Sequence, residues 1–163
     1  MVRGYSIEEL RALARGRPED FCTRFRHAWL VWEPGPWRRA SPFARTIRPD
    51  DEDTPPPLPR PQAQCVPLDV GEGPAFIRVG RSPQCEVMIN DATVSRVHLG
   101  LARDTAGDWH CVALSASASY LEVFMTIGEA QHLSDGDQVR VGEVVLTLHG
   151  MTSMAERVFA SAN

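Results

Sequence analysis

Three short polar segments carry the residue types that could do chemistry in this chain: Gly80-Arg81, Ser95-Arg96-Val97-His98 and Asp135-Gly136-Asp137. An arginine guanidinium is a planar, permanently charged donor, and a serine hydroxyl both donates and accepts hydrogen bonds. Arg81, Ser95 and Arg96 therefore suit the binding of an oxyanion such as phosphate. The alternative for Arg81 is a salt bridge with Glu86 or Asp91, and Gly-Arg or Asp-Gly-Asp sequences also form ordinary turns.

Catalysis is not indicated. No Ser, Asp or second His stands at a triad or metal-ligand spacing from His98, and neither a nucleophile elbow nor a pair of catalytic carboxylates is recognisable. Every basic residue is Arg, so a Walker A loop and a Schiff-base lysine are excluded. We expect a non-enzymatic protein with no catalytic residue, cofactor or metal.

Charge is uneven along the chain. Residues 1–64 carry a net charge of +2 and residues 65–163 one of −6, which argues against a nucleic-acid partner. No apolar run reaches the roughly 18 residues of a membrane span, and the N-terminus has no signal-peptide pattern. We therefore expect a cytoplasmic protein that does not bind membranes. The four cysteines lie far apart and are expected to be reduced thiols.

Residues 1–33 form a predicted helical region. Ser6 with Glu9 is a capping box that opens a first helix, and a second helix is predicted from Pro18 to about residue 33. Four aromatic residues repeat along that second helix at spacings of four, four and three: Phe21, Phe25, Trp29 and Trp32. Two short helices cannot bury this stripe against each other, so it docks on the following domain, which we favour, or on a partner.

Residues 34–67 are predicted to be a partly stiff linker, because they combine an acidic run with Pro55-Pro56-Pro57. Residues 68–150 then show short alternating apolar stretches separated by turn sequences, a pattern typical of an antiparallel β-sandwich. Gly142-Glu143 suits a II′ hairpin turn. Residues 151–163 are a tail with a possible short helix, capped by Thr152 or Ser153.

The order of these motifs resembles the forkhead-associated (FHA) domain of bacterial type. The resemblance extends from about Phe76 to Leu148, under half of the chain. It is carried by the following segments: Val79-Gly80-Arg81-Ser82, Cys85-Glu86-Val87, Val94-Ser95-Arg96-Val97-His98, Trp109, Leu133-Ser134-Asp135-Gly136-Asp137 and Val141-Gly142. It implies a mainly β fold, an FHA-like antiparallel β-sandwich, here preceded by a short N-terminal helical hairpin.

The resemblance also implies roles for individual residues. Arg81, Ser95 and Arg96 would hold the phosphate of a phosphothreonine peptide, while Gly80 and His98 would brace the binding loops. FHA domains normally carry an Asn-Gly pair that holds the peptide backbone, but here residues 115–120 read Ser-Ala-Ser-Ala-Ser-Tyr. Ser117 or Ser119 would replace the amide only in part, which makes the motif degenerate.

Two functions remain as hypotheses. The first is a signalling adaptor that binds a phosphorylated protein, such as a Ser/Thr kinase or its substrate, with weakened or altered specificity. The alternative is a phosphate-independent scaffold that binds partners through Phe21, Phe25, Trp29 and Trp32. A self-binding variant of the first would use phosphorylated Thr46 or Thr54 of the linker.

Overall fold

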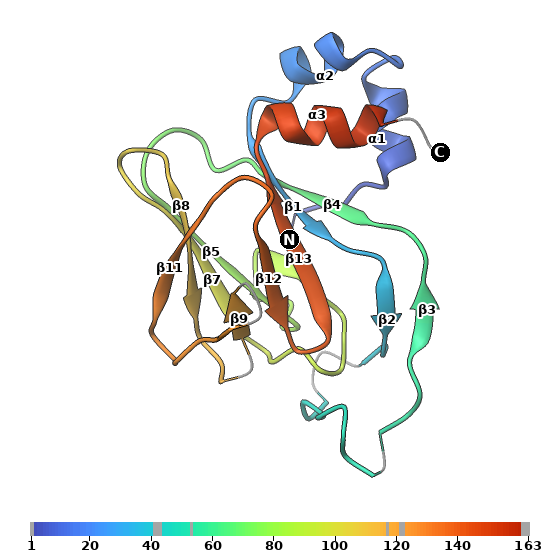
Figure 1. Ribbon diagram of the computed structural model, residues 1–163, viewed down its shortest axis with the longest axis vertical. Coiled ribbons are helices and arrows are strands. Elements are labelled where there is room, and N and C mark those ends of the chain that lie inside the picture. The colour runs from blue at the N-terminus through green and yellow to red at the C-terminus, as the bar shows by residue number, and fades with distance from the viewer. Residues whose placement is uncertain (1, 41–43, 53, 117, 121–122, 161–163) are drawn as a thin grey trace.

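The structure is a computed structural model that describes residues 2–40, 44–52, 54–116, 118–120 and 123–160. Figure 1 shows two layers of strands with the helices gathered at one end. In chain order the elements are α1 (Ile7–Leu13), α2 (Pro18–Arg24), β1 (Ala28–Trp32), β2 (Gly35–Trp37), β3 (Leu58–Arg60), β4 (Gln64–Leu68), β5 (Ala75–Gly80), β6 (Val87–Met88), β7 (Leu99–Arg103), β8 (Trp109–Ala113), β9 (Ala118–Tyr120), β10 (Val123–Phe124), β11 (Ala130–Leu133), β12 (Gln138–Val141), β13 (Val144–His149) and α3 (Met151–Phe159).

Two sheets form the sandwich. One has the strand order β10-β9-β12-β13-β1-β4 and the other has the order β11-β8-β7-β5-β6. All pairs are antiparallel except β5 with β6, which are parallel through Val79 and Val87. Apolar residues that alternate along both sheets, among them Leu99, Leu101 and Leu146, are buried in one core. The predicted fold class, a mainly β antiparallel sandwich preceded by short helices, is confirmed.

The predicted second helix is too long, because residues 28–32 form strand β1. This strand lies between β13 and β4, with Leu30 opposite Leu148 on one side and Val66 on the other. Trp29 and Val31 project into a cluster of helical residues, whereas Leu30 and Trp32 project into the sandwich core. Such two-sided burial produces a continuous apolar run, and a run of this kind does not distinguish a strand from a buried helix.

The three helices form a second core against the outer face of β1. Ser6 caps α1, and the reciprocal hydrogen bonds of its predicted capping box are present. Helix α3 confirms the short C-terminal helix, but its N-cap is Gly150, so the predicted caps Thr152 and Ser153 are wrong. Apolar residues from all three helices and from β1 are buried together: Leu10, Ala14, Phe21, Trp29, Val31, Met154, Ala155 and Val158.

The predicted linker, residues 34–67, contains regular structure. Strands β2 and β3 pair through Gly35 with Arg60 and through Trp37 with Leu58, and β4 joins the six-stranded sheet. The sandwich therefore does not begin at residue 68, since β1 and β4 complete one of its sheets. Sequence reasoning missed these strands because Pro36, Pro59 and Pro67 lack an amide donor, a loss that edge strands tolerate.

Two further expectations concern the turn at Gly142 and the thiols. Gly142 has φ +62° and Glu143 does not have a positive φ, as a II′ turn requires. All four cysteines are free thiols, and three of them are buried. None of the helices described is long and apolar enough to cross a membrane.

Candidate anion-binding site

Two loops meet just after β5: the one that begins at Gly80 and the one that contains Ser95 and Arg96. The amide of Arg81 donates to the carbonyl of Ser95, and the amide of Ser82 donates to the carbonyl of Arg96, both at 3.0 Å. A Cβ atom at Gly80 would stand 2.4 Å from the Arg96 carbonyl oxygen. Gly80 is therefore required by close backbone approach rather than by a positive φ.

His98 fixes one of these loops from inside. Its side chain is fully buried, and its Nδ1 atom accepts a hydrogen bond from the Ser95 amide at 2.9 Å. Its own backbone joins β5 to the end of β8, because its amide donates to Val79 and its carbonyl accepts from Leu114. An accepting Nδ1 places the proton of the neutral ring on Nε2. His98 thus has a bracing geometry.

Arg81 lies beneath the surface of this loop cluster. Its Nε atom donates to the Val94 carbonyl at 3.0 Å, and its Nη2 atom donates to the Ala44 carbonyl at 2.6 Å and to the Thr46 hydroxyl at 3.2 Å. The side chain has no exposed area. Burial and the charge of nearby Arg96 lower the pKa of Arg81, which still remains protonated at neutral pH.

The acidic residues considered for Arg81 have other documented partners. Glu86 forms an ion pair with Arg78 at 2.7 Å, and hydrogen bonds from Arg78 lower the pKa of Glu86 to about 2. Asp91 accepts hydrogen bonds from the amide and hydroxyl of Thr93 through Oδ1. The charge of Asp91 still acts on Arg81, because it partly offsets the lowering of the Arg81 pKa by burial and by Arg96.

Only some of the other predicted site residues lie in this loop cluster. The Ser95 hydroxyl lies 2.9 Å from the hydroxyl of Ser115, and Arg96 is exposed beside them. Ser117 lies outside the described residues. Ser119 pairs with Arg140 within the sheet, so its backbone belongs to β9 and not to a loop. Ser115 was missed, although its place directly after the 109–113 alternation is a signal that could have found it.

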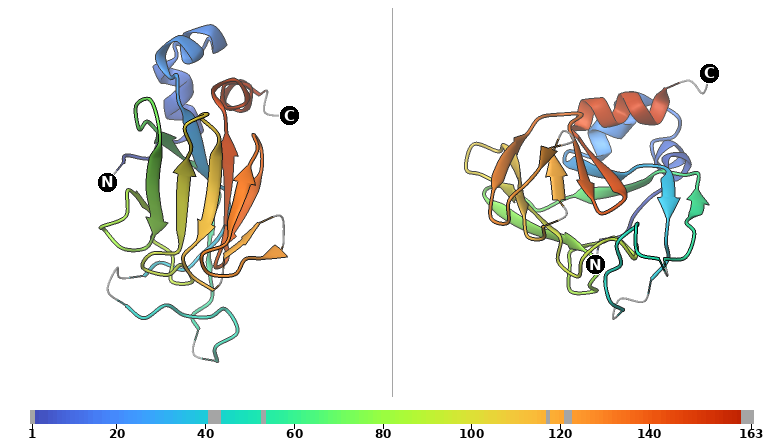
Figure 2. Two further views of the ribbon diagram at one scale, coloured as in Figure 1. Left: turned by 90° about the vertical axis from the view of Figure 1, so that its left-hand side faces the viewer. Right: turned by 60° about the horizontal axis from the view of Figure 1, so that its bottom comes forward.

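Residues 44–47, here called the covering segment, lie over Arg81. The Ile47 amide donates to the Ala92 carbonyl at 3.0 Å, which holds one end of the segment on the same loop as Thr93 and Ser95. Figure 2 shows the chain between β2 and β3 passing across the end of the sandwich that is opposite the helices. Sequence reasoning treated residues 34–67 as a partly stiff linker, and only its self-binding variant brought Thr46 or Thr54 to these loops.

The chain before the covering segment is held by Arg38. The Arg38 amide donates to Asp91 Oδ2 at 2.9 Å, and the Arg38 carbonyl accepts from the Ala92 amide at 2.7 Å. The Arg38 guanidinium pairs with Glu143 at 2.8 Å, and that pairing raises the pKa of Arg38. These bonds, together with that of Ile47, dock the chain before the covering segment and the end of the segment itself onto the 91–92 loop.

The prediction that the aromatic stripe forms an exposed partner-binding face is wrong. Phe21 and Trp29 have no exposed area, and Trp32 is 6% exposed. Phe25 packs edge-on against Trp29 at the border of the helical core. The stripe is divided between two cores because its residues lie on α2, on the turn after it and on β1. Docking within the chain, the favoured expectation, is confirmed.

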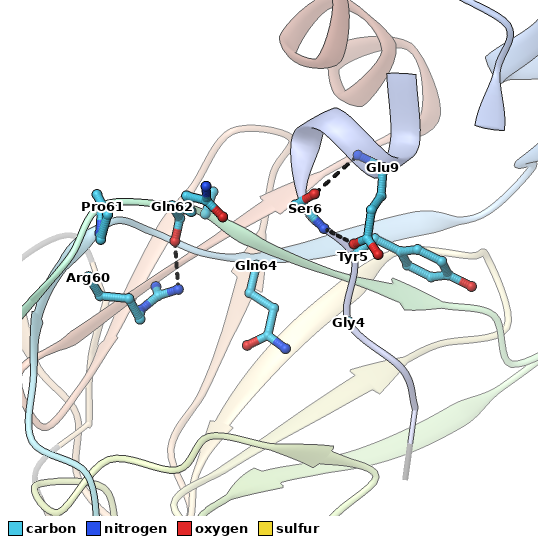
Figure 3. A pocket seen from close by; sticks show the side chains of 9 residues that line it. Gly4, Tyr5, Ser6, Glu9, Arg60, Pro61, Gln62 and Gln64 are labelled. Carbon is cyan, nitrogen blue, oxygen red and sulfur yellow. Dashed lines mark hydrogen bonds between the residues drawn. The ribbon is translucent and has the colours of Figure 1, made fainter. Parts of the chain in front are cut away.

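A hollow of about 390 Å³ lies elsewhere, beside the start of α1 (Figure 3). Several of its polar groups bond to one another, since Ser6 and Glu9 form the capping box and Arg60 donates to the Gln62 carbonyl. No group of three or more His, Cys, Asp or Glu side chains in the described parts of the chain is placed to hold a metal. The Arg81 cluster is therefore the better candidate site.

Residues 77–142 match the family model described as "FHA domain". This range contains Arg81, Ser95, Arg96 and His98, so the candidate site lies inside the matched part of the chain. No match was found among curated proteins.

Three solved structures are similar to parts of this chain. The FHA domain of an Arabidopsis thaliana protein is 23% identical, with a TM-score of 0.49 over 77% of this chain and 86% of that one. Mycobacterium tuberculosis EmbR in complex with a low-affinity phosphopeptide is 25% identical, with a TM-score of 0.45 over 52% of this chain and 21% of EmbR. The 1–466 segment of Rad53 from S. cerevisiae in complex with AMP-PNP is 18% identical, with a TM-score of 0.44 over 52% of this chain and 24% of that one. The chain thus spans about a quarter or less of the latter two.

Proposed function

We propose that this chain is a non-enzymatic adaptor that binds phosphothreonine-containing peptides through the loop cluster around Arg81. The observation that carries the proposal is the contact between the Arg81 guanidinium and a threonine hydroxyl at 3.2 Å, inside an FHA domain. A threonine side chain already reaches the cation at this position. A phosphothreonine there would bring a dianion to the same guanidinium.

The surrounding groups suit a phosphate. Arg96 is exposed beside the cluster, and the Ser95 and Ser115 hydroxyls lie next to each other. A serine hydroxyl can donate to a phosphate oxygen, and a second guanidinium adds to the attraction. The proposed partner is a phosphorylated protein, such as a Ser/Thr kinase or its substrate. Binding would require the covering segment to move away from Arg81.

Affinity is expected to be modest. Residues 115–120 contain no Asn or Gly to hold the peptide backbone, and the loss of such hydrogen bonds costs about 1–3 kcal/mol, or roughly tenfold to a hundredfold in Kd. Specificity for residues flanking the phosphothreonine would change for the same reason.

Fluorescence titration with a degenerate phosphothreonine peptide library tests the proposal. Binding should require the phosphate and should fall at least about tenfold in Arg81→Gln, as expected for loss of a charged hydrogen-bonding pair. Arg78→Gln is the matched control, because Arg78 lies on β5, three residues before Arg81, but pairs with Glu86 at the surface. Its affinity should equal that of the unaltered chain.

Arg81 is buried, so Arg81→Gln must be checked for folding by circular dichroism. Arg96→Gln gives a second test at an exposed position and should weaken binding without a change in Tm. Equal binding of phosphorylated and unphosphorylated libraries would refute the proposal. So would affinity unaffected by both substitutions.

A further inference from the structure

We propose that Thr46 is a phosphorylation site and that the phosphorylated covering segment is the internal ligand of the Arg81 site, which it closes to other phosphopeptides. This inference rests on the proposed function, since it assigns the regulation of the same site. Its starting observation is that the segment is already seated on Arg81 through two of its residues, Ala44 and Thr46.

The contacts single out Thr46 among the threonines of the 34–67 segment. The Thr54 hydroxyl donates to the Arg48 carbonyl at 2.8 Å and its amide donates to Asp51, so Thr54 is held in a local turn. The Thr46 hydroxyl instead accepts from the Arg81 guanidinium at 3.2 Å. Of the two linker threonines that a self-binding protein could use, the geometry assigns the role to Thr46.

The seat for Thr46 is built from backbone on both sides. Before it, the Ala44 carbonyl accepts from Arg81; after it, the Ile47 amide donates to the Ala92 carbonyl. Farther back, Arg38 is bonded to Asp91 and Ala92. These bonds fix the register of the segment, so Thr46 is the side chain directed at the guanidinium. A phosphate on Thr46 would need no long movement of the chain to reach Arg81.

Charge favours the phosphorylated form in this position. A phosphothreonine adds about −1.5 to −2 charges and three strong acceptor oxygens. Arg81 is buried next to Thr46, and the charge of Arg96 is close enough to lower the pKa of Arg81. A hydroxyl offers these cations one neutral acceptor, whereas a phosphate offers them a charged, multidentate one.

The modification itself is ordinary phosphoryl transfer from a nucleoside triphosphate by a Ser/Thr kinase. A bond forms between Thr46 Oγ1 and the γ-phosphorus, the bond from that phosphorus to the β,γ-bridging oxygen breaks, and the nucleoside diphosphate leaves. The hydroxyl proton passes to a base of the kinase. Thr46 is partly exposed, and its neighbours Arg45 and Arg48 are exposed, in a segment that belongs to no helix or strand. The substrate segment is therefore accessible once it lifts from the site.

A tethered ligand competes strongly with free ones. Short flexible connections give effective concentrations on the order of millimolar. A phosphorylated segment attached to the same chain would therefore displace an external phosphopeptide of micromolar affinity. We expect the apparent affinity for an external phosphothreonine peptide to fall at least about tenfold when Thr46 is phosphorylated.

The test uses the full chain with phosphothreonine placed at position 46, compared with phosphothreonine at position 54 as the matched control. The first readout is a ³¹P NMR titration of the phosphate. The second pKa of phosphothreonine 46 should lie below the ordinary value of about 6, because the guanidinium favours the dianion. That lowering should disappear in Arg81→Gln and should be absent for phosphothreonine 54.

The second readout is the affinity of each chain for one probe, a synthetic peptide of residues 40–52 carrying phosphothreonine 46. The unmodified chain should bind this probe, Thr46→Val should bind it at least as tightly, and the chain phosphorylated at Thr46 should bind it at least about tenfold more weakly. Phosphorylation at Thr54 should leave the affinity unchanged.

The outcomes separate the two proposals. If the unmodified chain binds the probe, but phosphorylation of Thr46 alters neither its affinity nor the pKa of the new phosphate, the internal ligand is refuted and the reader function stands. If neither the unmodified chain nor Thr46→Val binds the probe and phosphothreonine 46 titrates normally, the internal ligand is refuted, and the reader function fails with it only if the phosphothreonine library does not bind either. A lowered phosphate pKa that depends on Arg81 supports the internal ligand even without binding of the probe.

Discussion

Gly80 and Arg81 are adjacent residues with opposite requirements. Gly80 must lack a side chain, because the Arg96 carbonyl occupies the place where a Cβ would stand. Arg81 must have a long one, because its guanidinium reaches across the loop to Val94 and to the covering segment. The geometry of the candidate site thus depends on a backbone contact that brings Arg81 and the loop of Ser95 and Arg96 together.

Gly80→Ala should destabilise the protein by about 1–3 kcal/mol, since the new methyl group would meet rigid backbone rather than a flexible side chain. Gly35→Ala is the control: nothing lies within 4 Å of its added Cβ, and its φ is not positive. That variant should stay within about 0.5 kcal/mol of the unaltered chain. Urea unfolding measures both. Equal stability of the two variants would show that the Gly80 contact is not tight.

His98→Ala should cost about 1–3 kcal/mol of unfolding free energy, because the Ser95 amide would lose its acceptor inside the protein. The same substitution should weaken phosphopeptide binding, since Ser95 would no longer be held. His132→Ala, at an exposed histidine, is the control and should change neither quantity. Unaltered peptide affinity in a folded His98→Ala protein would contradict a bracing role.

At the scale of elements, β1 joins two cores that the sequence suggested were separate domains. Its alternate residues face the sandwich and the helices, so the helices are built onto the sheet rather than linked to it. Trp29→Ala should therefore destabilise the whole protein by about 3–5 kcal/mol. Ile127→Ala, at a residue 62% exposed, should have little effect.

Thermal unfolding followed separately by tryptophan fluorescence and by far-ultraviolet circular dichroism measures the effect of Trp29→Ala. A single, lowered transition is expected. If the helices melted alone while the sandwich kept its Tm, the coupling through β1 would be disproved.

Helix α3 is also tied to the sheet by a polar network. Arg157 forms a two-pronged ion pair with Glu33 at 2.6 Å, and its Nη1 donates to His149 Nε2 at 3.1 Å. Burial raises the pKa of Glu33, but hydrogen bonds from Arg157 and Thr147 outweigh it, so the net pKa is lowered. Burial, followed by the charge of Arg157, lowers the pKa of His149.

Both shifts predict a loss of stability in acid. The folded state binds protons at His149 and Glu33 less readily than the unfolded state does. Protonation of each group therefore favours the unfolded state and lowers the free energy of unfolding. Stability should fall as pH drops below about 6.5, the ordinary His value, and fall further below about 4.3, the ordinary Glu value. The free energy of unfolding, measured with urea at pH 7.5, 6.5 and 5.5, should fall less over this range in His149→Gln than in the unaltered chain. His132→Gln should show the same fall as the unaltered chain. An identical fall in all three proteins would contradict the role of His149.

For the whole molecule, the sequence predicted the features that depend on local spacing. The capping box at Ser6, the alternating strands and the turn at Gly142 need only neighbouring residues to be recognised. The helix predicted through Trp29 and Trp32 was wrong, because burial on both faces removes the alternation that marks a strand. The pairing of β1 with β13 joins residues more than 100 positions apart and leaves no local signal.

The candidate site shows the same limit. Arg81, Ser95 and His98 could be found from motif order, and the structure brings them into one loop cluster. For self-binding, the sequence named Thr46 and Thr54 alike; the choice of Thr46 follows from distant contacts such as Arg38 with Asp91, which leave no local signal. The helices lie at one end of the sandwich and these loops at the other, so the two ends can be tested independently (Figure 2).

The most direct test of phosphothreonine recognition is a ¹⁵N NMR titration of the chain with a phosphothreonine peptide and with its unphosphorylated counterpart. The phosphorylated peptide should shift the amides of Gly80–Ser82, Ser95–His98 and the covering segment, and leave the amides of the three helices unchanged. The unphosphorylated peptide should shift none of them. Equal shifts with both peptides, or shifts confined to the helices, would contradict the account.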